Sequence, residues 1–172
     1  MRTLIALLRA VNVGGTGKLP MADLRAMAEA AGFTDVRTYI QSGNLVFSSS
    51  EEMSVVRAAL EQRLAAYAGK PVGILLRTAD ELQDVLEANP FPQAEPSKVG
   101  VLFLDAPPPS DTIETVSGKD CEELALGQRE VFIHYPSGMG RTKLRLPALS
   151  GMSEGTTRNI NTVAKLVKLA AE

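Results

Sequence analysis

Cysteine and histidine are almost absent from this sequence of 172 residues, which holds one of each, Cys121 and His134. A single cysteine excludes an internal disulfide framework and any multi-cysteine metal site. One histidine removes most zinc chemistries as well, because zinc sites draw on several Cys or His ligands. We therefore expect no metal and no cofactor. The two residues could pair as nucleophile and base on adjacent strands, although packing is the commoner role for such residues.

Aromatic residues make up only 5% of the sequence, and long apolar runs are missing. RNA-recognition domains stack bases on sheet aromatics, whereas the third predicted strand here reads Asn44-Leu45-Val46-Phe47. We therefore expect no sheet-face stacking of RNA. No segment approaches the roughly 20 apolar residues of a membrane helix. We therefore expect a soluble, cytoplasmic protein. The net charge of −2 gives no sign of an anionic membrane as a partner.

In the first half of the sequence, short apolar runs typical of strands are interspersed with segments of helical apolar spacing. The predicted elements, in chain order, are a strand at 4–8, a helix from about 20 to 31, strands at 36–41 and 45–48, a helix from about 52 to 68, and a strand at 72–76. Capping-box pairs are expected at Ser49 with Glu52 and at Thr78 with Glu81. The order strand, helix, strand, strand, helix, strand is the ferredoxin-like pattern.

The second half repeats this order in part. A third helix ends near Asn89, and a proline-rich linker at 90–97 precedes the predicted elements: a strand at 99–104, a short helix at 110–116, strands at 123–126 and 130–135, and a last helix from about 157. We therefore predict an α+β protein of tandem ferredoxin-like type. A complete βαββαβ subdomain at 1–89 precedes a partial βαββα copy at 98–172, which lacks the fourth strand.

Two polar loops are expected to meet at one edge of the first sheet. A right-handed crossover makes the first two strands parallel, so the loops that follow them lie at the same edge. The residues brought together in this way are Arg9, Asn12, Gly14, Gly15, Lys18, Gln41, Ser42 and Asn44. Backbone N–H groups and a helix start favour negative charge, so this edge can bind an anion. The alternative is a glycine-rich turn with solvated cations.

Nucleotide motifs do not explain the glycine-rich loop. The phosphate-binding Walker pattern needs glycine at Asn12 and Ser or Thr at Leu19. The dinucleotide pattern needs a third glycine where Pro20 stands. Both patterns are therefore excluded as they are usually written.

A second polar group opens the last predicted helix, where Thr157, Arg158 and Asn159 could hold a phosphate or a carboxylate. Arg141 and Lys143, in the preceding glycine-rich segment, could add positive charge. An ordinary helix N-cap is the simpler interpretation of the spacing.

Three stretches together resemble a bacterial family, the domain of unknown function numbered 1697. They are Leu7-Leu8-Arg9-Ala10-Val11-Asn12-Val13-Gly14-Gly15 with Lys18-Leu19-Pro20-Met21, then Tyr39-Ile40-Gln41-Ser42-Gly43-Asn44-Leu45-Val46-Phe47, then Thr156-Thr157-Arg158-Asn159-Ile160-Asn161-Thr162-Val163. The family pattern has Gly at Ala10, Ile at Val11 and Trp at Ile160, so this sequence departs from it mildly. The resemblance implies a duplicated ferredoxin-like arrangement and carries no activity.

The leading hypothesis is a protein that binds a phosphate-bearing small molecule, a nucleotide or a nucleic-acid end. Arg9, Lys18 and Arg158 would neutralise charge, and the amide and hydroxyl side chains would orient the ligand. An enzyme acting on such a ligand is an alternative, although the sequence identifies no catalytic residue. A protein–protein interaction module is the third possibility, and the oligomeric state is left open.

Overall fold

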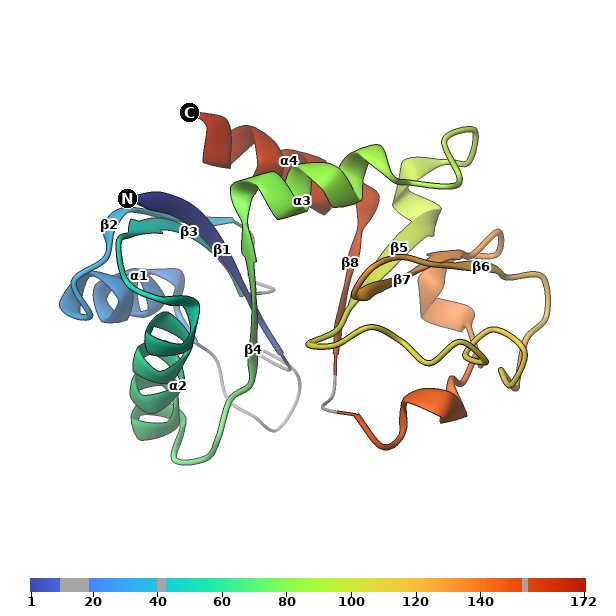
Figure 1. The fold of residues 1–172 in the computed structure, drawn as a ribbon, viewed down its shortest axis with the longest axis horizontal. Helices are drawn as coiled ribbons and strands as arrows, with labels where there is room; N and C mark the ends of the chain where they lie inside the picture. Colours follow the sequence, from blue (N-terminus) through green and yellow to red (C-terminus); the bar gives the residue numbers. More distant parts are fainter. Residues whose placement is uncertain (10–18, 40–42, 153–154) are drawn as a thin grey trace. The chain divides into compact units, whose positions relative to one another are not determined.

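The computed structural model of the chain describes residues 1–9, 19–39, 43–152 and 155–172. Contacts divide them into two units, Met1–Gln83 with Lys165–Glu172, and Asp84–Ala164. The described residues form four α-helices and two four-stranded antiparallel sheets (Figure 1), which confirms the α+β class. The division expected at residues 90–97, between subdomains 1–89 and 98–172, stays a prediction about which parts fold separately.

The first unit follows the predicted order of elements. They are β1 (Arg2–Leu8), α1 (Met21–Ala30), β2 (Thr34–Tyr39), β3 (Asn44–Ser49), α2 (Met53–Ala68) and β4 (Ile74–Thr78). The sheet has the order β2-β3-β1-β4. Since β1 and β2 are each antiparallel to β3, they are parallel to each other, and their carboxyl ends share one edge of the sheet. The predicted strand orientation is confirmed.

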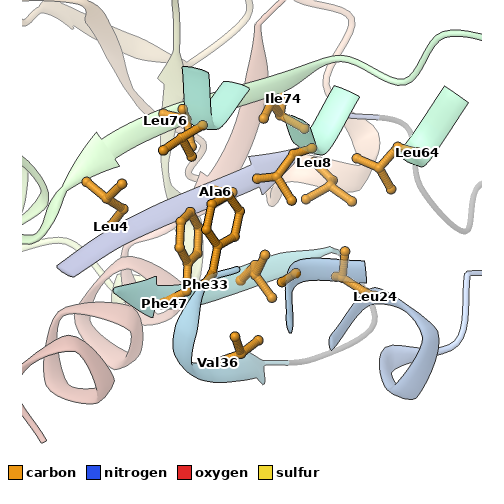
Figure 2. Packing of buried hydrophobic residues seen from close by; sticks show 14 of the residues in the cluster. Leu4, Ala6, Leu8, Leu24, Phe33, Val36, Phe47, Leu64, Ile74 and Leu76 are labelled. Atoms are coloured by element: carbon orange, nitrogen blue, oxygen red, sulfur yellow. The ribbon is translucent and has the colours of Figure 1, made fainter. Parts of the chain in front are cut away.

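Helices α1 and α2 cover one face of this sheet (Figure 1). Alternate residues of β1 point toward them, and Leu4, Ala6 and Leu8 are all buried in the shared core (Figure 2). In the same core, the rings of Phe33 and Phe47 stack with their centroids 4.6 Å apart and 19° between their planes. The intervening residues of the same apolar run, Ile5 and Leu7, are also buried, so β1 is apolar on both faces of the sheet.

The two predicted capping boxes have different outcomes. Thr78 and Glu81 bond reciprocally, with backbone-to-side-chain distances of 2.9 and 3.1 Å, at the start of α3 (Ala79–Glu87). The box predicted at Ser49 and Glu52 is wrong, because Glu52 is itself the N-cap of α2 and makes no side-chain cap bond. The hydroxyl of Ser49 instead accepts the N–H of Glu51 at 3.1 Å.

The second unit contains its own sheet. Its strands are β5 (Val99–Phe103), β6 (Glu123–Leu126), β7 (Glu130–His134) and β8 (Thr156–Asn159), in the order β6-β7-β5-β8. Short 3-10 helices lie at Pro96–Lys98, Met139–Arg141 and Pro147–Leu149. The predicted hairpin between β6 and β7 is confirmed, and the N–H of Gly127 bonds the carbonyl of Glu130 at 2.7 Å.

Two sequence-based expectations for the second unit are corrected. The expected missing fourth strand exists as β8, which pairs antiparallel with β5, and helix α4 begins only at Ile160 and ends at Ala171. The β-branched pair Thr156-Thr157 suits a strand, which explains the difference. The short helix expected at 110–116 is a series of turns, with bonds such as Thr115 N–H to Asp111 O at 3.1 Å.

The carboxyl end of α4 belongs to the first unit and lies against β2. The Arg37 guanidinium donates a hydrogen bond to the carbonyl of Leu169, which is one of the last carbonyls of α4. A cation at this end of a helix also interacts favourably with the helix dipole. Across the described part of the chain, no helix combines the length and the apolar character needed to cross a bilayer.

Candidate functional site

The strand ends at one edge of the first sheet are tied together by backbone hydrogen bonds. The N–H of Leu8 donates to the carbonyl of Gly43 at 2.8 Å, just before β3 begins. The N–H of Arg9 donates to the carbonyl of Gly73 at 2.9 Å, just before β4 begins. The end of β1 and the starts of β3 and β4 therefore meet at the edge where the sequence placed its polar loops.

Arg9 is a cation at this edge, and its half-buried side chain lies across Gly73. A Cβ atom placed on Gly73 would stand 2.5 Å from Nη2 of Arg9 and 2.8 Å from both Cζ and Nε. Leu8 and Ile74 point into the core under α1 and α2, so the alternation places Arg9 and Gly73 on the opposite face of the sheet. The guanidinium is thus held close to the backbone of the neighbouring strand.

Asn44 stands on the same face, at the start of β3, because its neighbour Leu45 points into the core. Its side chain is fully buried, and Nδ2 donates to the carbonyl of Tyr39 at 3.0 Å. The amide therefore joins the end of β2 to the start of β3. Sequence reasoning placed Asn44 at this edge, and its predicted contact with a ligand stays a prediction.

The remaining residues predicted for this edge are Asn12, Gly14, Gly15, Lys18, Gln41 and Ser42, all of which lie outside the described residues. Their places in the chain are nevertheless informative. The first four lie between Arg9 and Leu19, and the last two lie between Tyr39 and Gly43.

Thr157, Arg158 and Asn159 lie in the second unit, on β8. Arg158 is buried, and its Nη1 donates to Thr156 Oγ1 at 2.7 Å and to the carbonyl of Thr157 at 3.1 Å. Burial lowers the pKa of Arg158 to about 10. The helix cap that the sequence placed at Thr157 is made by Asn159, whose Oδ1 accepts the N–H of Thr162 at 2.9 Å.

The two candidate reactive residues have different partners. Cys121 is exposed, and its Sγ lies 3.5 Å from the hydroxyl of Ser137. His134 Nδ1 lies 3.4 Å from Glu123 Oε1, and its ring packs against Phe91 with 5.8 Å between centroids. These contacts give no support to a thiol and imidazole pair. Within the described ranges, no cluster of three or more His, Cys, Asp or Glu side chains is placed to hold a metal ion.

A buried carboxylate that the sequence did not single out lies beside Cys121. Glu122 accepts the N–H of Asp120 at 2.7 Å and the hydroxyl of Thr142 at 2.8 Å. These hydrogen bonds hold the pKa of Glu122 below its usual value. Burial and the charge of Glu122 together raise the pKa of Tyr135 to about 12. The group joins distant loops of the second unit, and no sequence spacing signals it.

An open groove of about 480 Å³ runs between α1 and α2 on the first unit. Small side chains line much of it, and Tyr67 crosses it to donate a hydrogen bond to Asp23 Oδ2 at 2.9 Å. That bond is the main cause that raises the pKa of Tyr67. The groove was also not predicted, since the two helices meet only through the tertiary fold.

Comparison with solved structures shows that this fold is similar to that of a bacterial protein. The conserved bacterial protein SP0830 from Streptococcus pneumoniae matches with a TM-score of 0.81 and 24% sequence identity, over 100% of this chain and 99% of that chain. At this identity the likeness concerns the fold alone. No match was found among the curated proteins.

The family comparison agrees with the motifs in the sequence. The family described as "Protein of unknown function (DUF1697)" matches residues 1–132, which include Arg9, Asn44 and Gly73. The match also covers both polar loops of the first unit, whereas β8 lies beyond it. Since more than half of the sequence is matched, the chain belongs to the DUF1697 family.

Proposed function

We propose that the edge of the first sheet binds a phosphate-bearing or otherwise anionic ligand. The observation that carries this proposal is the position of Arg9. Its guanidinium lies across Gly73, directly before the start of β4. Arginine offers five N–H donors in a planar fork, which suits the oxygens of a phosphate or a carboxylate.

The chain around Arg9 supports the same proposal. The segment from Arg9 to Leu19 leads into α1, which begins at Met21. This segment contains Lys18 and several glycines, a composition that favours backbone N–H contacts with an anion. In the proposal Lys18 adds a second positive charge, and Asn12, Gln41 and Ser42 orient the ligand. Asn44 acts through the turn that it closes, since its side chain is buried.

We further propose that the two units are tandem ferredoxin-like folds. When the strands are ranked within each unit, both sheets have the order second, third, first, fourth. In the second copy, turns and 3-10 helices would replace the two helices of the first. The first copy retains its helix start beside the polar loops, which favours it as the binding unit. Thr157, Arg158 and Asn159 of the second unit stay predicted ligand contacts.

A nucleotide, a phosphorylated metabolite or a nucleic-acid end would supply the required anion, and bacterial cytoplasmic metabolites are the first ligands to test. A thermal-shift screen detects such a ligand because binding stabilises the folded state, by about 2.7 kcal/mol at 100 times Kd. We expect a phosphorylated compound to raise Tm and its dephosphorylated counterpart to leave Tm unchanged.

The deciding variant is Arg9→Ala, which should weaken affinity for the screened compound roughly tenfold or more, since it removes charge-assisted hydrogen bonds. Arg25→Ala is the matched control. Arg25 lies on α1 of the same unit, and its side chain is 59% exposed in a surface ion pair with Glu29. Equal affinities for the two variants would show that Arg9 does not hold the anion. Arg158→Ala tests the second unit in the same titration.

A further inference from the structure

Gly73 differs from the other glycines that the structure describes in the first unit because its backbone conformation does not require glycine. Among the described glycines of this unit, the left-handed ones are Gly32, Gly43 and Gly69, with φ between 74° and 93°. Gly73 is not among them, so an L-amino acid could adopt its backbone conformation. Something other than the local chain geometry must therefore account for a glycine directly before β4.

The space beside Gly73 gives that reason. The volume that a Cβ atom would fill is already occupied by three atoms of the Arg9 guanidinium group, at 2.5 to 2.8 Å. Contacts under about 3 Å to a Cβ atom are not tolerated, so one of the two groups has to move. Glycine within or beside a strand commonly marks such a close approach.

We infer that Gly73 is a positioning residue for Arg9. Because glycine has no Cβ, the guanidinium group of Arg9 can occupy the space beside the Gly73 backbone at the sheet edge. This inference rests on the proposed function only where it concerns binding. The backbone bond from Arg9 N–H to Gly73 O holds the two residues opposite each other. The side chain of Arg9 then folds over its cross-strand neighbour, where a larger residue would deny it that place.

A methyl group at this position should move the arginine and leave the fold intact. The atoms in the way belong to the far end of a flexible side chain, which can rotate, and the Arg9 to Gly73 backbone bond needs no Cβ. Gly73→Ala therefore displaces the guanidinium without unfolding the sheet. This property separates a positioning role from a purely structural one.

The test compares Gly73→Ala with Gly140→Ala in the full chain. Gly140 is the matched control, because a Cβ atom added to it would meet no atom within 4 Å and its φ is not left-handed. The first readout is the Nε–Hε NMR signal of Arg9, assigned by its loss in Arg9→Lys. The second is affinity for inorganic phosphate, measured by titration at constant ionic strength.

We expect Gly73→Ala to shift the Arg9 Nε–Hε signal and to weaken phosphate binding about tenfold, as loss of a charge-assisted hydrogen bond does. Gly140→Ala should change neither readout. In an Arg9→Ala background, Gly73→Ala should alter phosphate affinity by less than about twofold, because the two residues act as a coupled pair.

The possible outcomes distinguish the positioning role of Gly73 from the proposed anion-binding function. An Arg9 signal that stays in place in Gly73→Ala overturns the inference, whatever happens to binding. A shifted signal in a protein that binds no phosphate supports the positioning role and counts against the proposed function. A loss of affinity that persists in the Arg9→Ala background would show that Gly73 affects binding by another route, and would also overturn the inference.

Discussion

Asn44 offers a direct choice between a structural and a ligand-binding role, and the Asn44→Ala substitution separates them. The side chain is fully buried and donates to the carbonyl of Tyr39 at 3.0 Å. Removing it leaves that buried acceptor without this donor, which costs about 1–3 kcal/mol. A small void adds to the loss. We therefore expect the free energy of unfolding to fall by about 2 kcal/mol.

Urea unfolding followed by far-ultraviolet circular dichroism measures this change, since the sequence contains no tryptophan for a fluorescence assay. The slope with denaturant should match that of the parent protein, so that the midpoint reports stability. Asn161→Ala is the control, because Asn161 is exposed on α4, and its effect should stay within about 0.5 kcal/mol. If Asn44→Ala keeps full stability yet loses phosphate affinity, the buried amide is a ligand contact and our reasoning is wrong.

Three further predictions concern stability and ionisation. Thr78→Ala should cost about 1 kcal/mol in urea unfolding, because it removes half of the reciprocal cap of α3. A double-mutant cycle of Phe33→Leu and Phe47→Leu should give a coupling of about 0.5–1.5 kcal/mol for the stacked rings, and an additive cycle would contradict it. Tyr135 should form tyrosinate at a pKa of about 12 in an absorbance titration, and Tyr135→Phe should remove that step. Since the folded pKa is raised above 10, the associated stability is present below pH 10 and is lost as pH rises through about 12. Glu122→Gln should bring the pKa of Tyr135 down.

Much of the first unit could be predicted because its signals are local. Short apolar runs mark the strands, and Gly32 with Phe33 marks the end of α1, where the N–H of Phe33 bonds the carbonyl of Ala28 at 3.1 Å. The edge shared by two polar loops followed from the handedness of the crossover. Local pattern and topology thus sufficed to place Arg9 and Asn44 at one edge.

The second unit was harder because its decisive contacts are distant in sequence. The strand β8 has four residues, Thr156 to Asn159, and all four are polar, so its pattern resembles a helix start. Its pairing with β5 is a tertiary event, in which Val101 faces Arg158. The contact of Gly73 with Arg9 was not predicted for the same reason. It joins residues that are distant in sequence, and Gly73 stands in no turn motif that would mark it.

The return of α4 to the first unit has a consequence for the order in which the protein is made. Arg37 bonds the carbonyl of Leu169, which is 132 positions later in the chain. At the usual rate of synthesis, roughly 5–20 residues per second, that carbonyl emerges on the order of ten seconds after its partner. Until then β2 lacks its contact with the last turn of α4, although the other strands of its sheet have already been synthesised. Of the two units, the first is therefore the earlier to begin folding on the ribosome, and it is completed only once α4 has been synthesised.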